Sequence, residues 1–198
     1  TGSWKTIVIL NFPNNPTGYS VTKDEAEAVV AALVEAANNG CNLIVVTDDA
    51  YFGLFYDDDV LQESLFARLA GAHERLLAVK VDGPTKEQFV WGFRTGMLTF
   101  GAKAALSEET LYGALEKKVA GAIRSAISNC SQPAQSVLTK AFGGKTLAGE
   151  QKEKREILEA RAMEAKRILG SPEFADVWEP YAFNAGYFMC LKLKHVTS

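Results

Sequence analysis

The chain has 198 residues, of which 47% are hydrophobic and 23% are charged, a composition typical of a folded globular protein. Its formal net charge of −3 argues against nucleic acid or an anionic membrane as a partner, because neither attracts a mildly acidic protein. The two histidines are far apart in sequence and lack the spacing of metal ligands, so we expect no metal centre. The three cysteines are scattered and odd in number, which favours reduced thiols in the cytoplasm, and no apolar run is long enough to predict a membrane span.

The first half of the chain has the pattern of an α/β fold. Residues 5–12 form a continuous apolar run, typical of a buried strand. Thr22 is followed three residues later by Glu25, the spacing of a capping box, which predicts a helix over residues 23–40. The elements that we expect next are strands over 42–48, 76–82 and 95–101 and a helix over 60–72. Continuous apolar strands separated by helices indicate a mainly parallel sheet with helices on both faces.

The second half is mostly helical and ends in a β-rich segment. The patterns predict helices over residues 107–127, 131–142 and 149–170, then β structure over 181–194. We therefore divide the chain into residues 1–146, part of a large α/β domain, and 147–198, the start of a smaller α+β domain. Both ends of the chain lie beside predicted strands, so we expect it to be part of a longer polypeptide.

Polar residues follow three of the predicted strands, where a parallel sheet binds its ligands. In chain order they are the Asn14-Asn15-Pro16-Thr17-Gly18 stretch, then Asp48, Asp49 and Tyr51, then Thr85, Lys86 and Arg94. A lysine amine forms a Schiff base with an aldehyde, and a guanidinium binds phosphate with two hydrogen bonds. A carboxylate keeps a facing ring nitrogen protonated, and a phenol or an amide can donate to a ring oxygen. A ligand with all four features is pyridoxal 5′-phosphate.

The sequence resembles the fold-type I, class I/II aminotransferases, which depend on this cofactor. The segments that carry the resemblance are NFPNNPTG, DDAY, the segment around Lys86 and NAGYF, and they span nearly the whole chain. The resemblance implies that Asn15 bonds the 3′-oxygen of the cofactor and that Asp48 pairs with its pyridine nitrogen. It also implies that Tyr51 donates to the same 3′-oxygen and that the peptide before Pro16 is cis.

For the lysine segment, the resemblance implies a covalent role. Lys86 would hold the cofactor as a Schiff base and would then move a proton between the substrate Cα and the cofactor. Arg94, eight residues later, would bind the phosphate with help from the hydroxyl of Thr85. The catalytic residues are then Lys86, Tyr51 and Asp48. The residues that bind the cofactor are these three together with Asn15, Thr85 and Arg94.

The lysine segment departs from the pattern of the family in two ways. Gly83 and Pro84 stand where relatives often have a hydroxyl and a backbone donor, so we expect the phosphate to depend more on backbone N–H groups. The family usually has small residues after its lysine, whereas this chain has larger ones. Phe89, Trp91 and Phe93 are expected to pack around Lys86 and keep water away from it.

The function that the resemblance favours is transfer of an amino group between an amino acid and a 2-oxo acid, with the full-length protein a homodimer. A lyase or decarboxylase on the same scaffold would use the same residues. A regulatory domain that senses the cofactor without catalysis would keep Lys86, Asp48 and Arg94 as well. The resemblance also implies that the arginine that binds the substrate carboxylate and the aromatic residue that stacks on the cofactor ring lie outside this chain.

Overall fold

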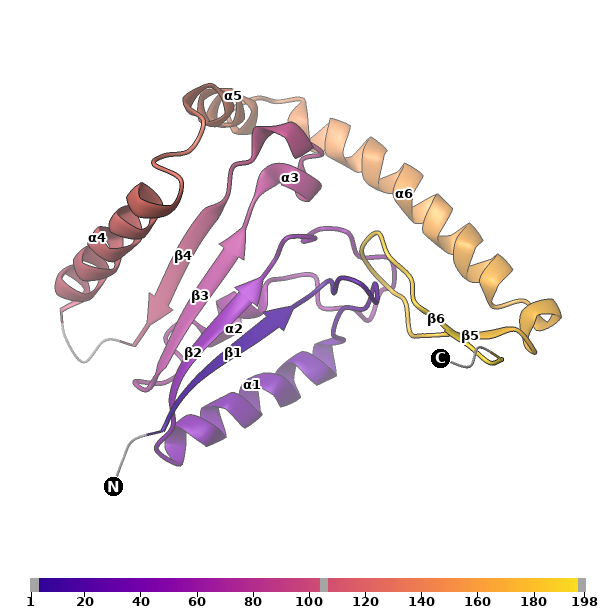
Figure 1. Cartoon of the computed structure of the whole chain (residues 1–198), viewed down its shortest axis with the longest axis horizontal. Helices are drawn as coiled ribbons and strands as arrows, with labels where there is room; N and C mark the ends of the chain where they lie inside the picture. Colours follow the sequence, from indigo (N-terminus) through magenta and orange to yellow (C-terminus); the bar gives the residue numbers. More distant parts are fainter. Residues whose placement is uncertain (1–3, 104–106, 196–198) are drawn as a thin grey trace.

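The centre of the molecule is a four-stranded sheet with the order β1-β2-β3-β4. A computed structural model describes residues 4–103 and 107–195 of the chain. The strands are β1 (Lys5–Asn11), β2 (Asn42–Asp48), β3 (Leu76–Asp82) and β4 (Met97–Ala102). The first three run parallel and β4 runs antiparallel to β3, so the predicted α/β fold with a mainly parallel sheet is confirmed (Figure 1).

One face of the sheet packs against α1 (Lys23–Asn38) and α2 (Leu65–Leu69). The capping box at the start of α1 is present, because the Thr22 hydroxyl accepts from the Glu25 N–H and the Glu25 carboxylate accepts from the Thr22 N–H. The aliphatic core between these layers is Val21, Leu43, Val45, Leu61, Leu65, Leu69 and Leu76 with the smaller residues Ala26, Ala37 and Ala78.

The prediction of a helix over residues 60–72 is wrong except at the centre of that range, where α2 lies. Val60 forms an isolated β-bridge with Thr22, and the Leu61 N–H donates to the Val21 carbonyl. These pairings hold the chain extended until Ser64, whose hydroxyl caps α2 by accepting from the Phe66 N–H. Contacts made at long range in the sequence therefore override the local helical pattern.

The opposite face of the sheet is aliphatic and partly exposed. Side chains alternate along a strand, so Ile7 and Ile9 of β1 point away from α1, and they are 67% and 68% exposed. Ile44 of β2 and Leu98 of β4 are also exposed. Among the described residues, this part of the face has no covering layer.

The second half of the chain leads away from the sheet and then returns to it. After β3 come α3 (Pro84–Glu87) and the short 3-10 helix η1 (Trp91–Phe93), and after β4 come α4 (Glu108–Ala126), α5 (Gln132–Phe142) and α6 (Leu147–Leu169). Figure 1 shows α6 as a long helix that runs outward from the end of the sheet near α3. No helix in the part of the chain that the structure describes is both long and apolar enough to cross a membrane.

The β structure expected over residues 181–194 is wrong for most of that segment. After η2 (Pro172–Phe174), the strands β5 (Trp178–Pro180) and β6 (Leu191–Leu193) pair in a two-stranded antiparallel sheet, and Ala185 between them forms an isolated β-bridge with Phe55. The residues between these two strands form a loop that extends back to the carboxyl end of the main sheet (Figure 1). Its backbone groups bond mainly to loops of the first half of the chain instead of to a neighbouring strand.

Candidate active site

Three segments that are distant in sequence meet beyond the carboxyl ends of the parallel strands. The Asn15 amide Nδ2 donates to the Tyr51 hydroxyl at 3.4 Å, and Lys86 Nζ lies over the Tyr51 ring, 5.5 Å from its centroid. Tyr51 is buried, Lys86 is half-buried and Asn15 is exposed. These three residues, here named the Tyr51 cluster, therefore bring an amide, a phenol and an amine together at one edge of the molecule.

The loop that carries Asn15 is fixed by its own side chains. Asn11 Oδ1 accepts from the Asn15 N–H at 2.9 Å and from Asn14 Nδ2 at 3.1 Å. Asn14 Oδ1 in turn accepts from the Thr17 N–H at 3.2 Å and from the Thr17 hydroxyl at 2.7 Å. The peptide bond before Pro16 is cis, as expected. A turn held by side-chain bonds of this kind gives the Asn15 amide a defined position.

Asp48 is the last residue of β2, and its carboxylate accepts from the Ala50 N–H at 3.2 Å. Thr47 and Asp49 line the same small cavity, so alternation along the strand places Asp48 on the opposite face of the sheet. The Asp48 side chain is half-buried. Among the described residues no hydrogen bond or ion pair joins its carboxylate to the Tyr51 cluster, although Tyr51 follows Asp48 by only three residues.

Thr85 and Arg94 lie at the two ends of the loop that contains Lys86. A Cβ on Gly83 would come within 2.8 Å of the Thr95 carbonyl oxygen, so the two ends of this loop approach closely and only glycine fits there. Arg94 is exposed in a left-handed conformation (φ 50°), and its guanidinium makes no hydrogen bond or ion pair with the described residues. Thr85 is half-buried in α3.

The aromatic residues after Lys86 do not all shield it. Phe89 is partly buried against Tyr51, Leu54 and Tyr56, as expected. Trp91 is 55% exposed and meets the Phe89 ring in edge-to-face geometry, with centroids 6.5 Å apart, so the expectation that it packs around Lys86 and keeps water away is wrong. Residues 91–93 form one 3-10 turn, in which successive side chains point in different directions, and Trp91 points outward.

A segment near the end of the chain covers the Tyr51 cluster. The Gly18 carbonyl accepts from the N–H groups of Asn184 and Ala185 at 3.0 and 2.9 Å. The buried Asn184 amide also bonds Ser20 twice, accepting from its N–H at 2.7 Å and donating to its carbonyl at 2.9 Å. The segment is thus fixed to the loop after β1 by four hydrogen bonds.

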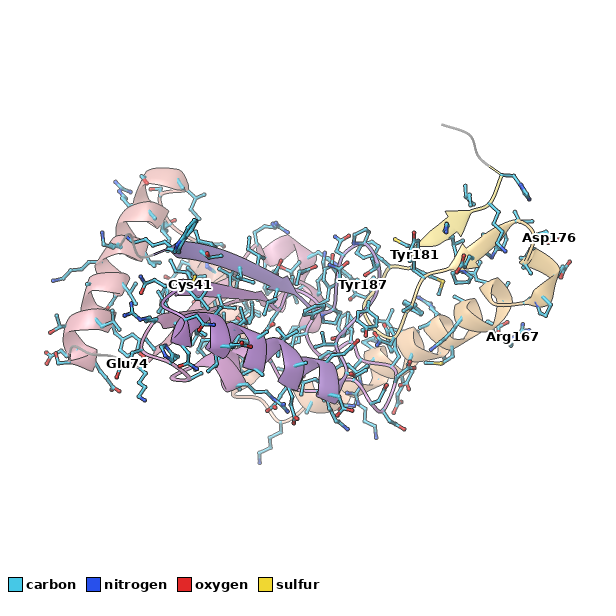
Figure 2. All side chains as sticks on the ribbon, turned by 90° about the horizontal axis from the view of Figure 1, so that it is seen from below. Cys41, Glu74, Arg167, Asp176, Tyr181 and Tyr187 are labelled. Carbon is cyan, nitrogen blue, oxygen red and sulfur yellow. The ribbon has the colours of Figure 1, made fainter. Side chains whose placement is uncertain are left out.

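Two aromatic residues of this segment reach the candidate site directly. The rings of Tyr187 and Phe188 each lie 5.7 Å from the Tyr51 ring in edge-to-face geometry, and the Tyr187 hydroxyl donates to the Lys86 carbonyl at 3.4 Å. Burial, and then the neighbouring Tyr51, raise the pKa of Tyr187 to about 12, so it remains a donor at neutral pH. In Figure 2, Tyr187 lies at the end of the sheet, whereas Tyr181 lies toward β5 and β6.

The sequence did not indicate a role for Tyr187, although this residue lies in the NAGYF segment that carries part of the resemblance. The usable signal is a pair of aromatic residues directly after Gly186, a position with positive φ where the chain turns sharply. What the sequence does not show is that this turn contacts a segment about 100 residues earlier in the chain.

A second polar cluster, also missed, lies at the same end of the sheet. Lys80 Nζ forms an ion pair with Asp82 and lies 3.7 Å from a carboxylate oxygen of Asp49, and these three residues are here named the Lys80 cluster. Burial raises the pKa of Asp49, which is only 5% exposed. Burial lowers the pKa of Lys80, but its hydrogen bond to Asp82 and the charges around it more than offset this, so the net shift is upward. The signal in the sequence is a lysine inside the otherwise apolar run LLAVKV.

Solved structures of aminotransferases share this fold. The structure of an aminotransferase from Anaerococcus prevotii superposes with a TM-score of 0.75 at 24% identity, over 92% of this chain and 44% of that protein. An alanine aminotransferase from Pyrococcus furiosus gives a TM-score of 0.73 at 17% identity, over 97% of this chain and 43% of that protein. At these identities the similarity concerns the fold.

Two comparisons of sequence agree with this fold. The curated kynurenine–oxoglutarate transaminase of Dictyostelium discoideum is 30% identical over 79 residues, which are 40% of this chain and 17% of the relative. The chain thus spans less than half the length of the relatives that it matches. The family model described as aminotransferase class I and II matches residues 2–198. With nearly every residue inside that match, the chain belongs to the class I and II aminotransferase family.

Proposed function

We propose that the full-length protein that contains this chain is a pyridoxal 5′-phosphate-dependent aminotransferase, which moves an amino group between an amino acid and a 2-oxo acid. The observation that carries the proposal is the meeting of Asn15, Tyr51 and Lys86 beyond the carboxyl ends of β1, β2 and β3. Membership of the family supports it independently.

The residues at this edge fit the cofactor. Lys86 would hold its aldehyde, Asp48 its pyridine nitrogen, and Asn15 and Tyr51 its ring oxygen. The exposed Arg94 guanidinium, which has no partner among the described residues, is suited to the phosphate. The close approach of Gly83 to the Thr95 carbonyl supports this assignment, because it brings the end of the loop with Thr85 near the end with Arg94.

The proposed roles follow from the contacts of each side chain. When bound, the cofactor supplies a ring that accepts electrons from the substrate Cα. The Lys86 amine would move the proton between the substrate Cα and the cofactor, and we propose Lys86, Tyr51 and Asp48 as the catalytic residues. The Tyr51 hydroxyl is positioned by Asn15 Nδ2 and by the edges of Tyr187 and Phe188, which also exclude water from one side of the Tyr51 ring.

We propose further that residues 1–146 belong to a large cofactor-binding domain and residues 147–198 begin a small one. The start of α6 at Leu147 supports this boundary, because α6 runs outward from the sheet (Figure 1). We also propose that the full-length protein is a cytoplasmic homodimer, which a sedimentation-equilibrium mass would test.

The test of the function uses the full-length protein. Its visible absorbance with added pyridoxal 5′-phosphate is compared between the parent and Lys86→Ala, and the band of the lysine-bound cofactor is expected only in the parent. Amino donors that include alanine and kynurenine, after which two relatives are named, are then supplied with 2-oxoglutarate. Formation of glutamate supports the proposal. Consumption of a donor without glutamate favours a lyase, and a bound cofactor with no reaction favours a regulatory role.

A further inference from the structure

A cavity of about 280 Å³ lies between α6 and the turn that follows Lys86. One wall is formed by residues 52–54 of the loop after β2 together with Glu87 and Phe89, and the other by the first turns of α6. The residues of α6 that line it, Ala148, Gln151, Lys152 and Arg155, recur at the spacing of one helix face. Gln151 Nε2 donates to the Glu87 carbonyl at 3.4 Å, so a hydrogen bond joins the two walls.

This cavity is separate from the candidate active site. None of Asn15, Tyr51 and Lys86 lines it. Lys86 and Glu87 are consecutive residues of α3, and successive side chains of a helix point about 100° apart. The Lys86 amine therefore lies over the Tyr51 ring, whereas the Glu87 side chain faces the cavity.

The charged groups of the cavity are divided between its walls. The α3 wall carries one carboxylate, Glu87, and the α6 wall carries two cations, Lys152 and Arg155. Arg155 makes no hydrogen bond or ion pair with the described residues, and Lys152 has only an exposed partner, Glu156, at 3.8 Å. Exposed pairs of this kind are weak, so both cations are available to an anionic group.

The negative charge of the Glu87 carboxylate is only partly balanced by nearby positive charge. Burial raises its pKa, and the nearby charges of Asp82 and Asp49 raise it further; a hydrogen bond with Gln88 and the charge of Lys80 oppose this, but the net shift is upward. Lys80 is already paired with Asp82. An ammonium group placed in the cavity would supply the missing positive charge.

The remaining lining is apolar. Phe52, Leu54 and Phe89 provide two aromatic rings and an aliphatic side chain between the charged groups. A volume of this size is at the lower end of small-molecule sites, and it suits a ligand of roughly ten heavy atoms. We propose that this cavity binds a free α-amino acid with an apolar or aromatic side chain, whose ammonium faces Glu87 and whose carboxylate faces Arg155 and Lys152.

The test is calorimetric titration of L-phenylalanine and L-leucine into the full-length protein. Lys86→Ala is titrated in parallel, because that variant removes the residue on which reaction with the amino acid would depend. Two analogues divide the charge pattern: 3-phenylpropanoate lacks the ammonium and 2-phenylethylamine lacks the carboxylate. Each is expected to bind about 10-fold more weakly than phenylalanine, the typical effect of losing one charged hydrogen-bonding group.

Variants of the cavity locate the binding. Glu87→Gln and Arg155→Gln are each expected to lower the affinity about 10-fold or more, whereas binding persists in Lys86→Ala. Lys154→Gln is the matched control, because Lys154 lies on the same helix but does not line the cavity, and it is expected to bind like the parent. Trp91 adds a second readout, since its ring touches Phe89 and its fluorescence should change on binding.

Three outcomes overturn the proposal. The first is the absence of binding up to about 10 mM of either amino acid, which exceeds the range of useful small-molecule affinity. The second is an affinity that neither cavity substitution changes. The third is binding that Lys86→Ala abolishes and Glu87→Gln preserves, which would assign the amino acid to the candidate active site. Because no product is measured, these outcomes do not depend on the proposed reaction.

Discussion

Two polar clusters lie at the same end of the sheet, and both contain a lysine. The Tyr51 cluster has an exposed amide and a half-buried amine that lies over the Tyr51 ring. The Lys80 cluster has an amine paired with two carboxylates, one of which is nearly inaccessible to solvent. Adjacent residues, Asp48 and Asp49, point toward the two different faces.

The two clusters differ in whether a carboxylate of the chain balances the positive charge of the lysine. The charge of Lys80 is balanced by side chains of the same chain, so this cluster holds the ends of β2 and β3 together. Lys86 makes no ion pair within the described residues, so its amine can react with a ligand. The contrast suggests that removing Lys80 should affect stability and that removing Lys86 should affect activity.

The largest effect is expected for Lys86→Ala. Loss of the amine should lower transamination by about 10³-fold or more, since a positioned proton-transfer group alone contributes that order. The free energy of unfolding should change by less than about 0.5 kcal/mol, because the side chain is half-buried and without a charged partner. Initial rates and urea unfolding of the same preparation measure both. A variant that keeps activity, or that unfolds far more easily, would remove the contrast between the clusters.

Lys80→Met should have the opposite profile. It leaves the carboxylates of Asp49 and Asp82 facing each other without a cation, and breaking a buried pair in this way costs about 3 kcal/mol. Methionine preserves most of the packing against Phe52, whose ring lies 5.5 Å from the amine. The measurement is urea unfolding of the full-length protein, with Lys154→Met as an exposed control of the same chemistry. Equal stabilities for the two variants would show that the Lys80 cluster has no structural role.

The sequence predicted the elements that local patterns specify. The apolar runs gave β1, β2 and β3, and the spacing of Thr22 and Glu25 gave the start of α1. It also placed Asn15, Tyr51 and Lys86 at one edge, because parallel strands bring their carboxyl ends together.

What the sequence could not predict depends on contacts between distant segments. The helix expected over residues 60–72 was shortened by the pairing of Val60 with Thr22. The loop with Asn184 and Tyr187 is held by hydrogen bonds to residues more than 100 positions away, and such bonds have no periodicity to recognise. The partners of Lys80 likewise follow from strand register.

A smaller effect is expected for Tyr187→Phe, which keeps the edge-to-face contact with Tyr51 but removes the hydroxyl that bonds the Lys86 carbonyl. Loss of one neutral hydrogen bond should lower the free energy of unfolding by about 1 kcal/mol. If this bond positions Lys86, the kcat should fall more than the KM changes. Tyr181→Phe is the matched control, because Tyr181 is 54% exposed and lies away from the site (Figure 2). Identical behaviour of the two variants would leave the loop between β5 and β6 without a role in positioning Lys86.

The smallest effect is expected for Asp49→Asn, which should raise the free energy of unfolding at pH 7, whereas the other substitutions lower stability or activity. Burial raises the pKa of Asp49 in the folded protein. A carboxyl of this kind contributes stability below its unfolded pKa, about 3.9, and loses that contribution as the pH rises through its folded pKa. The parent is therefore penalised at pH 7 and not at pH 3.5, whereas the neutral amide carries no such penalty. We expect the variant to be more stable at pH 7 by up to about 1 kcal/mol, with the gain lost at the lower pH.

Asp58→Asn, an exposed aspartate, serves as the control for removing one negative charge from this protein. Urea unfolding at the two pH values gives the comparison for both variants. If Asp49→Asn is instead destabilising at pH 7, the ion pair between Asp49 and Lys80 outweighs the cost of burying the Asp49 carboxylate. Its 3.7 Å separation, longer than a hydrogen bond, argues for the first result, because at that distance the pair gains charge attraction without a hydrogen bond to replace lost water. In the Asp49→Asn variant the positive charge of Lys80 keeps a partner, because Lys80 also forms an ion pair with Asp82.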